Sequence, residues 1–434
     1  MACGGPGDHE FDLSNQLDRT LHEHLVAIGG GRHAFQMPTS DVASYYKIPQ
    51  DPNNPLTPAK VALGKLLFHE TGLGVNPRDP DGLLSYSCAS CHHAPGGFQA
   101  CRRQGVGEGG IGFGLTGEAR VLRPDYEIDS IDVQPVRTPS ALNIAYQANV
   151  LWNGQFGATG VNVGTETRWA YGTPINDNHL GFEGTETQAI AGLNVHRLRA
   201  DSALVQGPRY KAMYDAAFPD VPVPQRYDRV RTGLAIAAYE RTLLANQAPF
   251  QRWLAGESGA MNDREKRGAI LFFSKANCYS CHTGPALNSM AFYALGMPDL
   301  IGTGIIKSLA SDPAHRGRGG FTGNPEDDYK FKVPQLYNLK DSPFYGHGGN
   351  FRSIREVVEY KNKGESANGR VPKSQLADEF VYLGLTDEEI DLLVEFISEG
   401  LYDPDLERYA PTTLPSGLCF PNNDDQSRRD LGCD

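Results

Sequence analysis

Two short stretches of the sequence repeat one pattern, in which two cysteines stand three positions apart and a histidine follows the second. The two sets are Cys88, Cys91 and His92 in CASCH, and Cys278, Cys281 and His282 in CYSCH. Cysteines at this spacing lie on one face of a helical turn and can bond one edge of a haem, while the next histidine points at the iron. The sequence therefore predicts two covalently bound haem c groups, with His92 and His282 as iron ligands.

A zinc site or a redox-active cysteine pair is the competing interpretation of each CxxC. Neither needs a histidine after every pair, and the pairs begin far apart, at 88 and at 278. Haem attachment therefore explains the pattern better. The other side of each iron then decides function, because a strong second ligand makes an electron carrier and an open position makes a site for peroxide or oxygen.

Helices of similar sequence are predicted before both motifs. Thr57 and Pro58 begin the first helix, since proline is tolerated in a first turn, and Asn262 caps the second. The stretch LGKLLFHETG precedes the first motif and RGAILFFSKA precedes the second. A helix, a short loop and CxxCH, occurring twice, indicate an internally duplicated chain with two like domains.

Two further helices complete the predicted elements. One covers 228–245 and opens the second domain, and Thr386 to Glu389 form a capping box that starts a last amphipathic helix. Strand periodicity is scarce, so we expect a mainly α fold with long loops. The predicted division is an extension that wraps the surface (1–55), a first haem domain with an insertion (56–224), a second haem domain (225–402) and a coil-like tail (403–434).

Composition excludes several classes of protein. The 434 residues are 40% hydrophobic and 21% charged, which is enough apolar material for two or three folded domains and too little charge for a disordered polyelectrolyte. The net charge of −12 argues against nucleic acid as the main partner and leaves a basic protein partner open. No run of about 20 apolar residues is present, so no membrane-spanning helix is expected.

The cysteines outside the two motifs bear on cellular location. Cys419 and Cys433 lie close together in the tail and predict a disulfide, which implies an oxidising compartment. No signal peptide is recognised at the start of the chain. Cys3 is either the acylated cysteine of a processed lipoprotein or an incidental thiol. We expect a periplasmic protein, with a lipid anchor at Cys3 as an option.

The sequence resembles the bacterial di-haem cytochrome c peroxidases and their MauG-like relatives over roughly 56–400. Four blocks carry the resemblance in the family's order: LGKLLF, RTPSALNIAYQANVLWNG, GTETQAIAG and FKVPQLYNLKDSPFYGHGGNFRSIREVVEY. The resemblance implies two cytochrome-c-like helical domains with one haem each, the first peroxidatic and the second for electron transfer.

The resemblance implies roles for three residues. Trp152 falls on the tryptophan between the two haems, where an indole shortens the tunnelling gap; a core tryptophan at a domain contact is the alternative. Gln188 falls on the distal glutamine of the first haem, and His347 falls near the second haem.

The chain departs from the family beside the first haem. The family's catalytic glutamate is missing, and a two-residue deletion in GLNVHR would put His196 in its place. Histidine is a competent acid–base group near neutral pH, an iron ligand, or a bystander at the surface. His179 and Glu183 are weaker candidates. The segment 101–136 contains no histidine to close this haem, so we expect an open site that needs no reductive activation.

A second departure concerns the far side of the second haem. The position of the family's distal ligand, methionine or tyrosine, holds Lys361 here, with its neighbour Tyr360 as the alternative after a register slip. Met290 and Met297 also remain open, and a solvated Lys361 is the competing interpretation. A hard N or O ligand would give this haem a lower potential than methionine would.

Calcium is in doubt. The family often binds Ca²⁺ between its domains through an asparagine and backbone carbonyls, for which Ser342 and Phe344 stand at the carbonyl positions. Arg137 replaces the asparagine, and a guanidinium supplies positive charge itself but cannot ligate a cation.

The leading prediction is a di-haem peroxidase that reduces hydrogen peroxide at the first haem, with electrons from a small cytochrome or cupredoxin passed through the second haem. One alternative is a MauG-like oxidase of a tryptophan or tyrosine on a partner protein. Another is a di-haem electron carrier without turnover. This alternative is favoured if His196 ligates the first iron.

Overall fold

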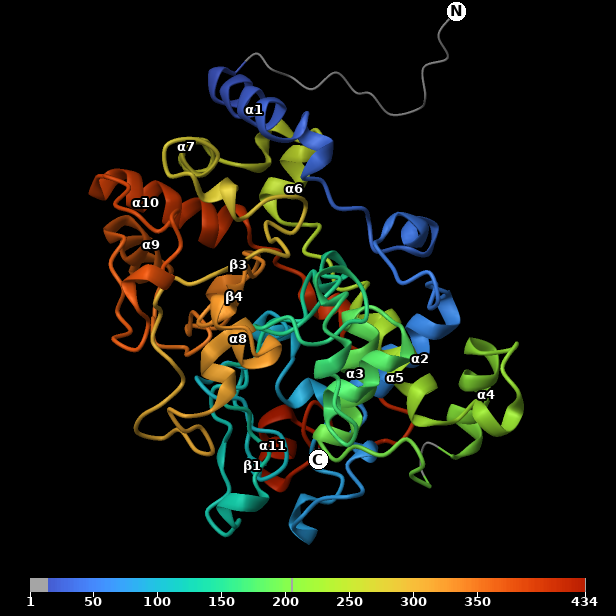
Figure 1. The fold of residues 1–434 in the computed structure, drawn as a ribbon. Coiled ribbons are helices and arrows are strands. Elements are labelled where there is room, and N and C mark those ends of the chain that lie inside the picture. Colours follow the sequence, from blue (N-terminus) through green and yellow to red (C-terminus); the bar gives the residue numbers. More distant parts are fainter. Residues whose placement is uncertain (1–14, 204–205, 434) are drawn as a thin grey trace, which may run out of the picture.

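The computed structural model describes residues 15–203 and 206–433, and this part of the chain is mainly helical (Figure 1). Within these ranges, eleven α-helices and two small sheets lie among long loops. Most of the helices form two groups.

The first group packs beside the first motif. Its members are α2 (Pro58–His69), α3 (Gly184–Val195), α4 (Pro208–Ala217) and α5 (Arg229–Glu240). α2 packs on α4 and α5, and α3 packs on α5. Thr57 caps α2 by accepting a hydrogen bond from the backbone N–H of Lys60, which confirms the predicted helix start. The α2–α5 crossing is close, because a Cβ at Gly64 would lie 1.8 Å from the carbonyl oxygen of Ala235.

The second group repeats this arrangement. Its members are α6 (Pro249–Leu254), α7 (Asp263–Phe272), α9 (Ile354–Lys363), α10 (Asp387–Glu395) and the π-helical turn Phe396–Gly400 that continues α10. The capping boxes begun by Asn262 and Thr386 both form. A Cβ at Gly268 would lie 2.1 Å from the carbonyl oxygen of Leu392. Gly64 and Gly268 hold equivalent places in LGKLLF and RGAILF, so both domains cross their helices over a glycine.

The amino-terminal region contains an element that the sequence does not predict. α1 (Gln16–Gly29) packs against α7 and buries Leu21 and Leu25 completely. Asp18 accepts a hydrogen bond from the indole N–H of Trp253 over 2.7 Å. Segments more than 200 positions away therefore hold α1, so only the folded chain reveals its buried face.

The helix placed at the start of the second domain differs in its packing and its length. α5 ends at Glu240 and packs on α2 and α3 of the first group. It closes the first domain in the way that α10 closes the second. We therefore propose that the first haem domain extends through α5, beyond the predicted boundary at 224.

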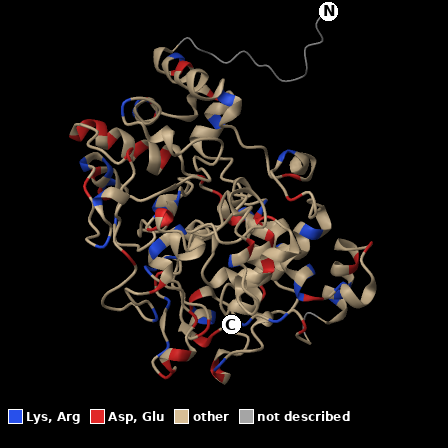
Figure 2. Cartoon of the chain, viewed as in Figure 1, with Lys and Arg blue, Asp and Glu red and all other residues tan. Residues whose placement is uncertain are grey.

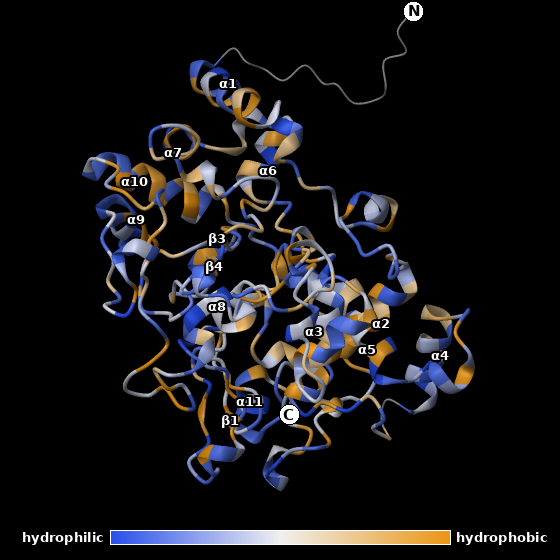
Figure 3. Ribbon diagram, in the orientation of Figure 1, coloured by the Kyte–Doolittle hydropathy of each residue, from blue (hydrophilic) through white to orange (hydrophobic). Residues whose placement is uncertain are grey.

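Two pairs of short strands and one more helix lie outside these two groups. They are β1 (Gly110–Ile111) paired with β2 (Val121–Leu122), β3 (Phe292–Tyr293) paired with β4 (Phe331–Lys332), both antiparallel, and α8 (Gly317–Thr322). One apolar core runs through both helical groups and includes Phe68, Tyr239, Phe250, Phe272 and Phe396. Figure 3 shows the corresponding apolar segments along α2, α5 and α10.

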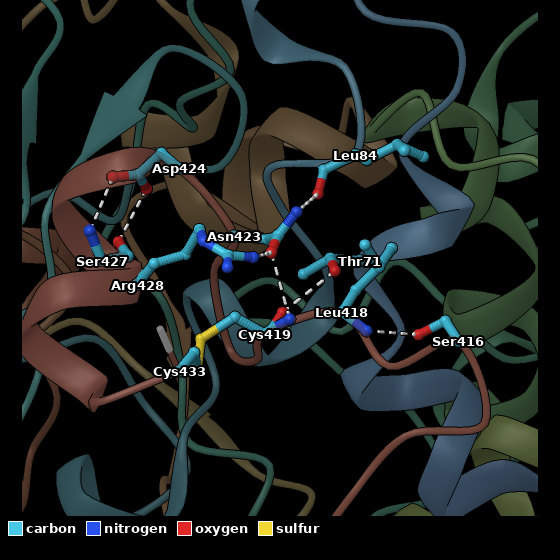
Figure 4. Close-up of a disulfide and its surroundings, with 10 residues drawn as sticks. All are labelled: Thr71, Leu84, Ser416, Leu418, Cys419, Asn423, Asp424, Ser427, Arg428 and Cys433. Atoms are coloured by element: carbon cyan, nitrogen blue, oxygen red, sulfur yellow. Dashed lines mark hydrogen bonds between the residues drawn. A yellow bond between two sulfur atoms is a disulfide. The ribbon is translucent and has the colours of Figure 1, made fainter.

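The carboxy-terminal tail is more ordered than a coil. It contains α11 (Asp425–Leu431), capped by Asp424, so the expectation of a coil-like tail is wrong there. The predicted disulfide Cys419–Cys433 forms, and the carbonyl of Cys419 accepts a hydrogen bond from the Thr71 hydroxyl (Figure 4). The hydroxyl of Ser87 donates to the carbonyl of Pro421 over 2.9 Å. The tail therefore lies against the first CxxCH motif.

Two features of the surface bear on partners. No helix in the described part of the chain is long and apolar enough to cross a bilayer. Basic and acidic residues are interspersed over the view in Figure 2. Cys3, which is either an anchor site or an incidental thiol, lies outside the described residues.

Candidate functional site

A single cavity of about 530 Å³ reaches both CxxCH motifs. The motif residues in its lining are Cys88, Cys91, His92, Cys278, Cys281 and His282. All four cysteines carry free thiols. Two motifs that are remote in sequence thus open into one continuous space.

The first motif forms a 3₁₀ turn over Cys88–Ser90 that turns His92 into the cavity. The backbone N–H of His92 donates to the carbonyl of Cys88, and its Nδ1 lies 3.2 Å from the carbonyl oxygen of Phe98. A ring nitrogen held by a backbone carbonyl fixes the tautomer and leaves Nε2 as the ligand atom.

The second motif repeats the geometry. The backbone N–H of His282 donates to the carbonyl of Cys278, and its Nδ1 lies 2.9 Å from the carbonyl oxygen of Leu287. Burial lowers the pKa of both His92 and His282 to about 4. Both imidazoles are therefore neutral at physiological pH, which is the form that binds a metal.

α3 supplies one wall of the first half of the cavity. Gln188, Gly192 and His196 are spaced four residues apart and so lie on one helix face, and all three line the cavity. Gly192 leaves the space between the two side chains free. Nδ1 of His196 lies 2.7 Å from a carboxylate oxygen of Asp132, whose side chain is only 5% exposed.

Trp152 lies in the wall of the cavity beside His347. Its indole N–H donates to the backbone carbonyl of Arg137 over 2.8 Å, and its ring lies edge-on to His347, with centroids 6.3 Å apart. His347 stacks on Phe331 and bonds the buried carboxylate of Asp299. Both Trp152 and His347 line the cavity, so they come together with the two motifs.

The wall near His282 distinguishes the candidate ligands. Lys361 and Met297 line the cavity, whereas Tyr360 and Met290 are not among the lining residues described. The Tyr360 hydroxyl donates to the carbonyl of Leu295 over 2.6 Å and its ring packs between aromatic neighbours. Burial lowers the pKa of Lys361 to about 8, and the charge of this lysine lowers the pKa of His282.

The family described as di-haem cytochrome c peroxidase matches residues 58–259. Cytochrome-c peroxidase IdrP1 of Denitromonas iodatirespirans is 29% identical over 379 residues, which cover 81% of this chain and 83% of that protein. Methylamine utilization protein MauG of Methylorubrum extorquens is 28% identical over 363 residues, covering 83% and 80%. The chain is therefore similar to di-haem cytochrome c peroxidases over about four fifths of its length.

Solved structures share the fold of this di-haem peroxidase. A MauG-like protein associated with microbial copper homeostasis matches with a TM-score of 0.57 and 22% identity, covering 86% of this chain and 97% of that one. The diheme peroxidase BthA of Burkholderia thailandensis matches with a TM-score of 0.52 and 19% identity, covering 83% and 89%. The protein is accordingly a mainly helical oxidoreductase of the di-haem peroxidase type, with haem as its cofactor.

The residues of the di-haem peroxidase fit haem c at both motifs. Each motif presents two free thiols and one neutral imidazole to the same cavity, with the imidazole oriented by a backbone carbonyl. Sulfur for the edge of the macrocycle and nitrogen for the iron are the donors that haem c needs.

The position suspected for calcium does not fit a cation. The Arg137 guanidinium donates there to four oxygen atoms, namely those of the Ala100 and Arg102 carbonyls, the Gln99 amide and the Ser342 hydroxyl. The guanidinium brings a fixed positive charge to this place and cannot itself ligate a metal ion.

Two of the weaker candidates lie away from the cavity. Nε2 of His179 lies 3.1 Å from the carbonyl oxygen of Trp169, and this histidine is exposed. Glu183 forms an ion pair with Arg241 at 2.9 Å. The structure brings neither of them to the motifs.

Several buried ionisable residues of the cavity escape sequence reasoning, among them Asp132, Lys332 and Glu240. Lys332 bonds the Gln147 amide, and burial lowers its pKa to about 7. Glu240 has one carboxylate oxygen without a hydrogen-bond partner, and burial together with Glu186 raises its pKa to about 8. No local motif surrounds any of the three. For Lys332 in FKVP and Glu240 in AYERTL, the available signal is a charged residue within an apolar segment.

Proposed function

We propose that this protein is a di-haem c-type peroxidase that reduces hydrogen peroxide at the haem held by Cys88, Cys91 and His92. The overall reaction takes two electrons and two protons and converts H2O2 into two molecules of water. The observation that supports it most is the α3 wall, where His196 and Gln188 face the cavity of His92 across the gap left by Gly192.

When bound, haem supplies the iron at which peroxide is reduced and at which electrons are stored. Cys88 and Cys91 would hold one haem by thioether bonds, and Cys278 and Cys281 would hold the other. His196 Nε2 is the proton-transfer atom, because Nδ1 is engaged by Asp132. The amide of Gln188 orients the peroxide.

His282 and Lys361 would hold the second haem, which would supply electrons to the first. Trp152 lines the same cavity and would shorten the transfer distance; its hydrogen bond to Arg137 and its contact with His347 keep the indole in one orientation. A small reduced cytochrome or cupredoxin donates the electrons that reduce the enzyme again after each turnover. The tail disulfide supports an oxidising compartment, so we place the protein in the periplasm, and attachment through Cys3 stays a prediction.

The test uses the holoenzyme with both haems counted by a pyridine haemochrome assay. We expect a high-spin component in the resting EPR spectrum that reacts with H2O2 within seconds, and steady turnover of a reduced small cytochrome. Two low-spin irons that are inert to peroxide would contradict the proposal and indicate an electron carrier.

Oxidation of a partner protein is the second candidate function. It is favoured by Lys361 in the cavity, because a hard nitrogen ligand favours oxidised iron, and by the similarity to MauG. A rapid reaction with peroxide without turnover of any small donor protein would favour this function over the first.

A further inference from the structure

The buried carboxylate of Asp132 pairs with the partly exposed imidazole of His196 at the end of α3. His196 is the residue that caps this helix, and Asp132 lies 64 positions earlier in a loop. The imidazole is 36% exposed and lines the cavity, while the carboxylate behind it is 5% exposed. His196 therefore has one nitrogen bound to Asp132 and the other available to the cavity.

The backbone around Asp132 is fixed independently of its side chain. The N–H of Gly107 donates to the carbonyl of Asp132 over 3.0 Å, and the N–H of Asp132 donates to the carbonyl of Glu108 over 2.9 Å. A Cβ at Gly107 would lie 2.6 Å from the Asp132 carboxylate, so the absence of a side chain makes room for it. Glu108 in turn pairs with Arg197, the residue after His196. The loop and the helix end are thus joined at two adjacent points.

We propose that Asp132 is a positioning residue for peroxide reduction: it keeps the proton of His196 on Nδ1 and leaves Nε2 as the atom that exchanges protons with peroxide. This rests on the proposed function. A carboxylate that accepts Nδ1–H holds an imidazole in one tautomer and stabilises its protonated form. Nε2 takes a proton from one oxygen of H2O2 and delivers it to the other, which leaves as water when the O–O bond accepts two electrons. Two protons from solvent complete the second water.

Asp132→Asn separates this role from a structural one. The amide has the same shape, but its NH2 group donates to Nδ1 and so places the ring proton on Nε2, where it blocks proton uptake. We expect the bimolecular rate constant for H2O2 at pH 7 in the holoenzyme to fall by about tenfold or more. His196→Gln should reduce it by on the order of 100-fold. The double variant should equal His196→Gln, because Asp132 acts through that ring.

The pH profile gives a second readout. Burial lowers the pKa of His196 and the Asp132 carboxylate raises it, with a net value above that of an ordinary histidine. Nε2 accepts a proton only in the neutral ring, so the rate falls as the pH drops through this pKa, and Asp132→Asn moves the acid limb to lower pH. The other titratable groups around the pair are Arg197, Lys307, Glu108 and the neutral His92. They are unchanged in the variant.

Matched variants control the comparison. Asp129→Asn changes the same charge on an exposed residue of the same loop and should leave rate and profile unchanged. If Asp132→Asn fails to load haem, Gly107→Ala displaces the carboxylate without removing it and should give the same loss. A wild-type rate in the Asp132 variants, or a loss that adds fully to that of His196→Gln, overturns the inference. A wild-type rate in His196→Gln instead contradicts the acid–base role in the proposed function.

Discussion

At the scale of single residues, each half of the cavity contains one neutral imidazole whose ring is oriented by a backbone carbonyl. The second polar group comes from α3 in the first half and from α9 in the second half. On α9 this group is Lys361, which lines the cavity with its pKa lowered by burial, while Tyr360 next to it bonds the backbone. Consecutive helical residues point about 100° apart, so only one of them can face the iron. Of these two, Lys361 lines the cavity; Met297 lines it as well, and we propose Lys361 as the ligand.

Lys361→Met is expected to raise the potential of the second haem, because a thioether stabilises the reduced iron better than an amine does. Spectroelectrochemistry of the holoenzyme measures the potential and the Soret spectrum together. Lys363→Met, on an exposed residue of the same helix, is the control. An unchanged potential and spectrum in Lys361→Met would remove this ligand assignment.

Gly192 leaves open the space beside the peroxide-binding wall. A Cβ there meets nothing closer than 3.4 Å, so Gly192→Ala should fold well and react normally. Gly192→Leu should fill the gap between Gln188 and His196 and slow the reaction with H2O2 by on the order of 100-fold. Stopped-flow absorbance measures both, and equal rates would show that peroxide does not use this space.

At the scale of elements, the two domains rely on the same helix crossing. α2 on α5 and α7 on α10 each meet over a glycine whose missing side chain lets a carbonyl approach. The shared LG/RG position in the two repeats therefore reflects packing rather than chemistry.

Gly268→Ala is expected to lower the free energy of unfolding by about 1–3 kcal/mol, because the new methyl group forces α7 away from α10. Gly259→Ala, where a Cβ meets nothing within 4 Å, is the matched control and should be near neutral. Thermal unfolding followed by circular dichroism measures both, and equal melting temperatures would contradict the account.

At the scale of the whole molecule, two connections hold the parts around the cavity. Arg137 joins the loop after the first motif to Ser342 of the second half and positions Trp152 through its carbonyl. The tail joins the far end of the chain to Ser87 and Ser90 beside the first motif. Both links lie outside the helices themselves.

Because the Arg137 guanidinium supplies the charge that a cation would bring, a chelator should change neither turnover nor the haem potentials. Dialysis against EDTA followed by assay and potentiometry tests this. Loss of activity that is restored by Ca²⁺ would show that calcium binds elsewhere or displaces the side chain.

Replacing both Cys419 and Cys433 by Ser opens a loop of 14 residues and should cost about 3 kcal/mol of stability. We expect a lower Tm and faster proteolysis of the tail. Adding reductant to the wild-type protein should reproduce the effect. If the wild-type protein and the double variant unfold identically, the hydrogen bonds of the tail are sufficient to hold it in place without the disulfide.

Local signals in the sequence were enough for much of this protein. The CxxCH spacing, the caps Thr57, Asn262 and Thr386, and the Cys419–Cys433 pairing each depend on residues close together along the chain, so they can be recognised without the fold. That the two CxxCH motifs attach haem remains an expectation, based on their chemistry and on the similarity to known proteins. α1 and the helix in the tail were missed because distant segments bury their faces.

The tertiary structure decided which distant residues meet. Asp132 and His196 are 64 positions apart and lie in segments without a motif, and their pairing depends on a backbone contact through Gly107. Lys361 and Tyr360 have the same local sequence context, and only the packing of α9 turns one into the cavity and the other away. Attachment chemistry is encoded in short-range spacing, whereas proton and electron control depends on burial and contacts that exist only once the chain has folded.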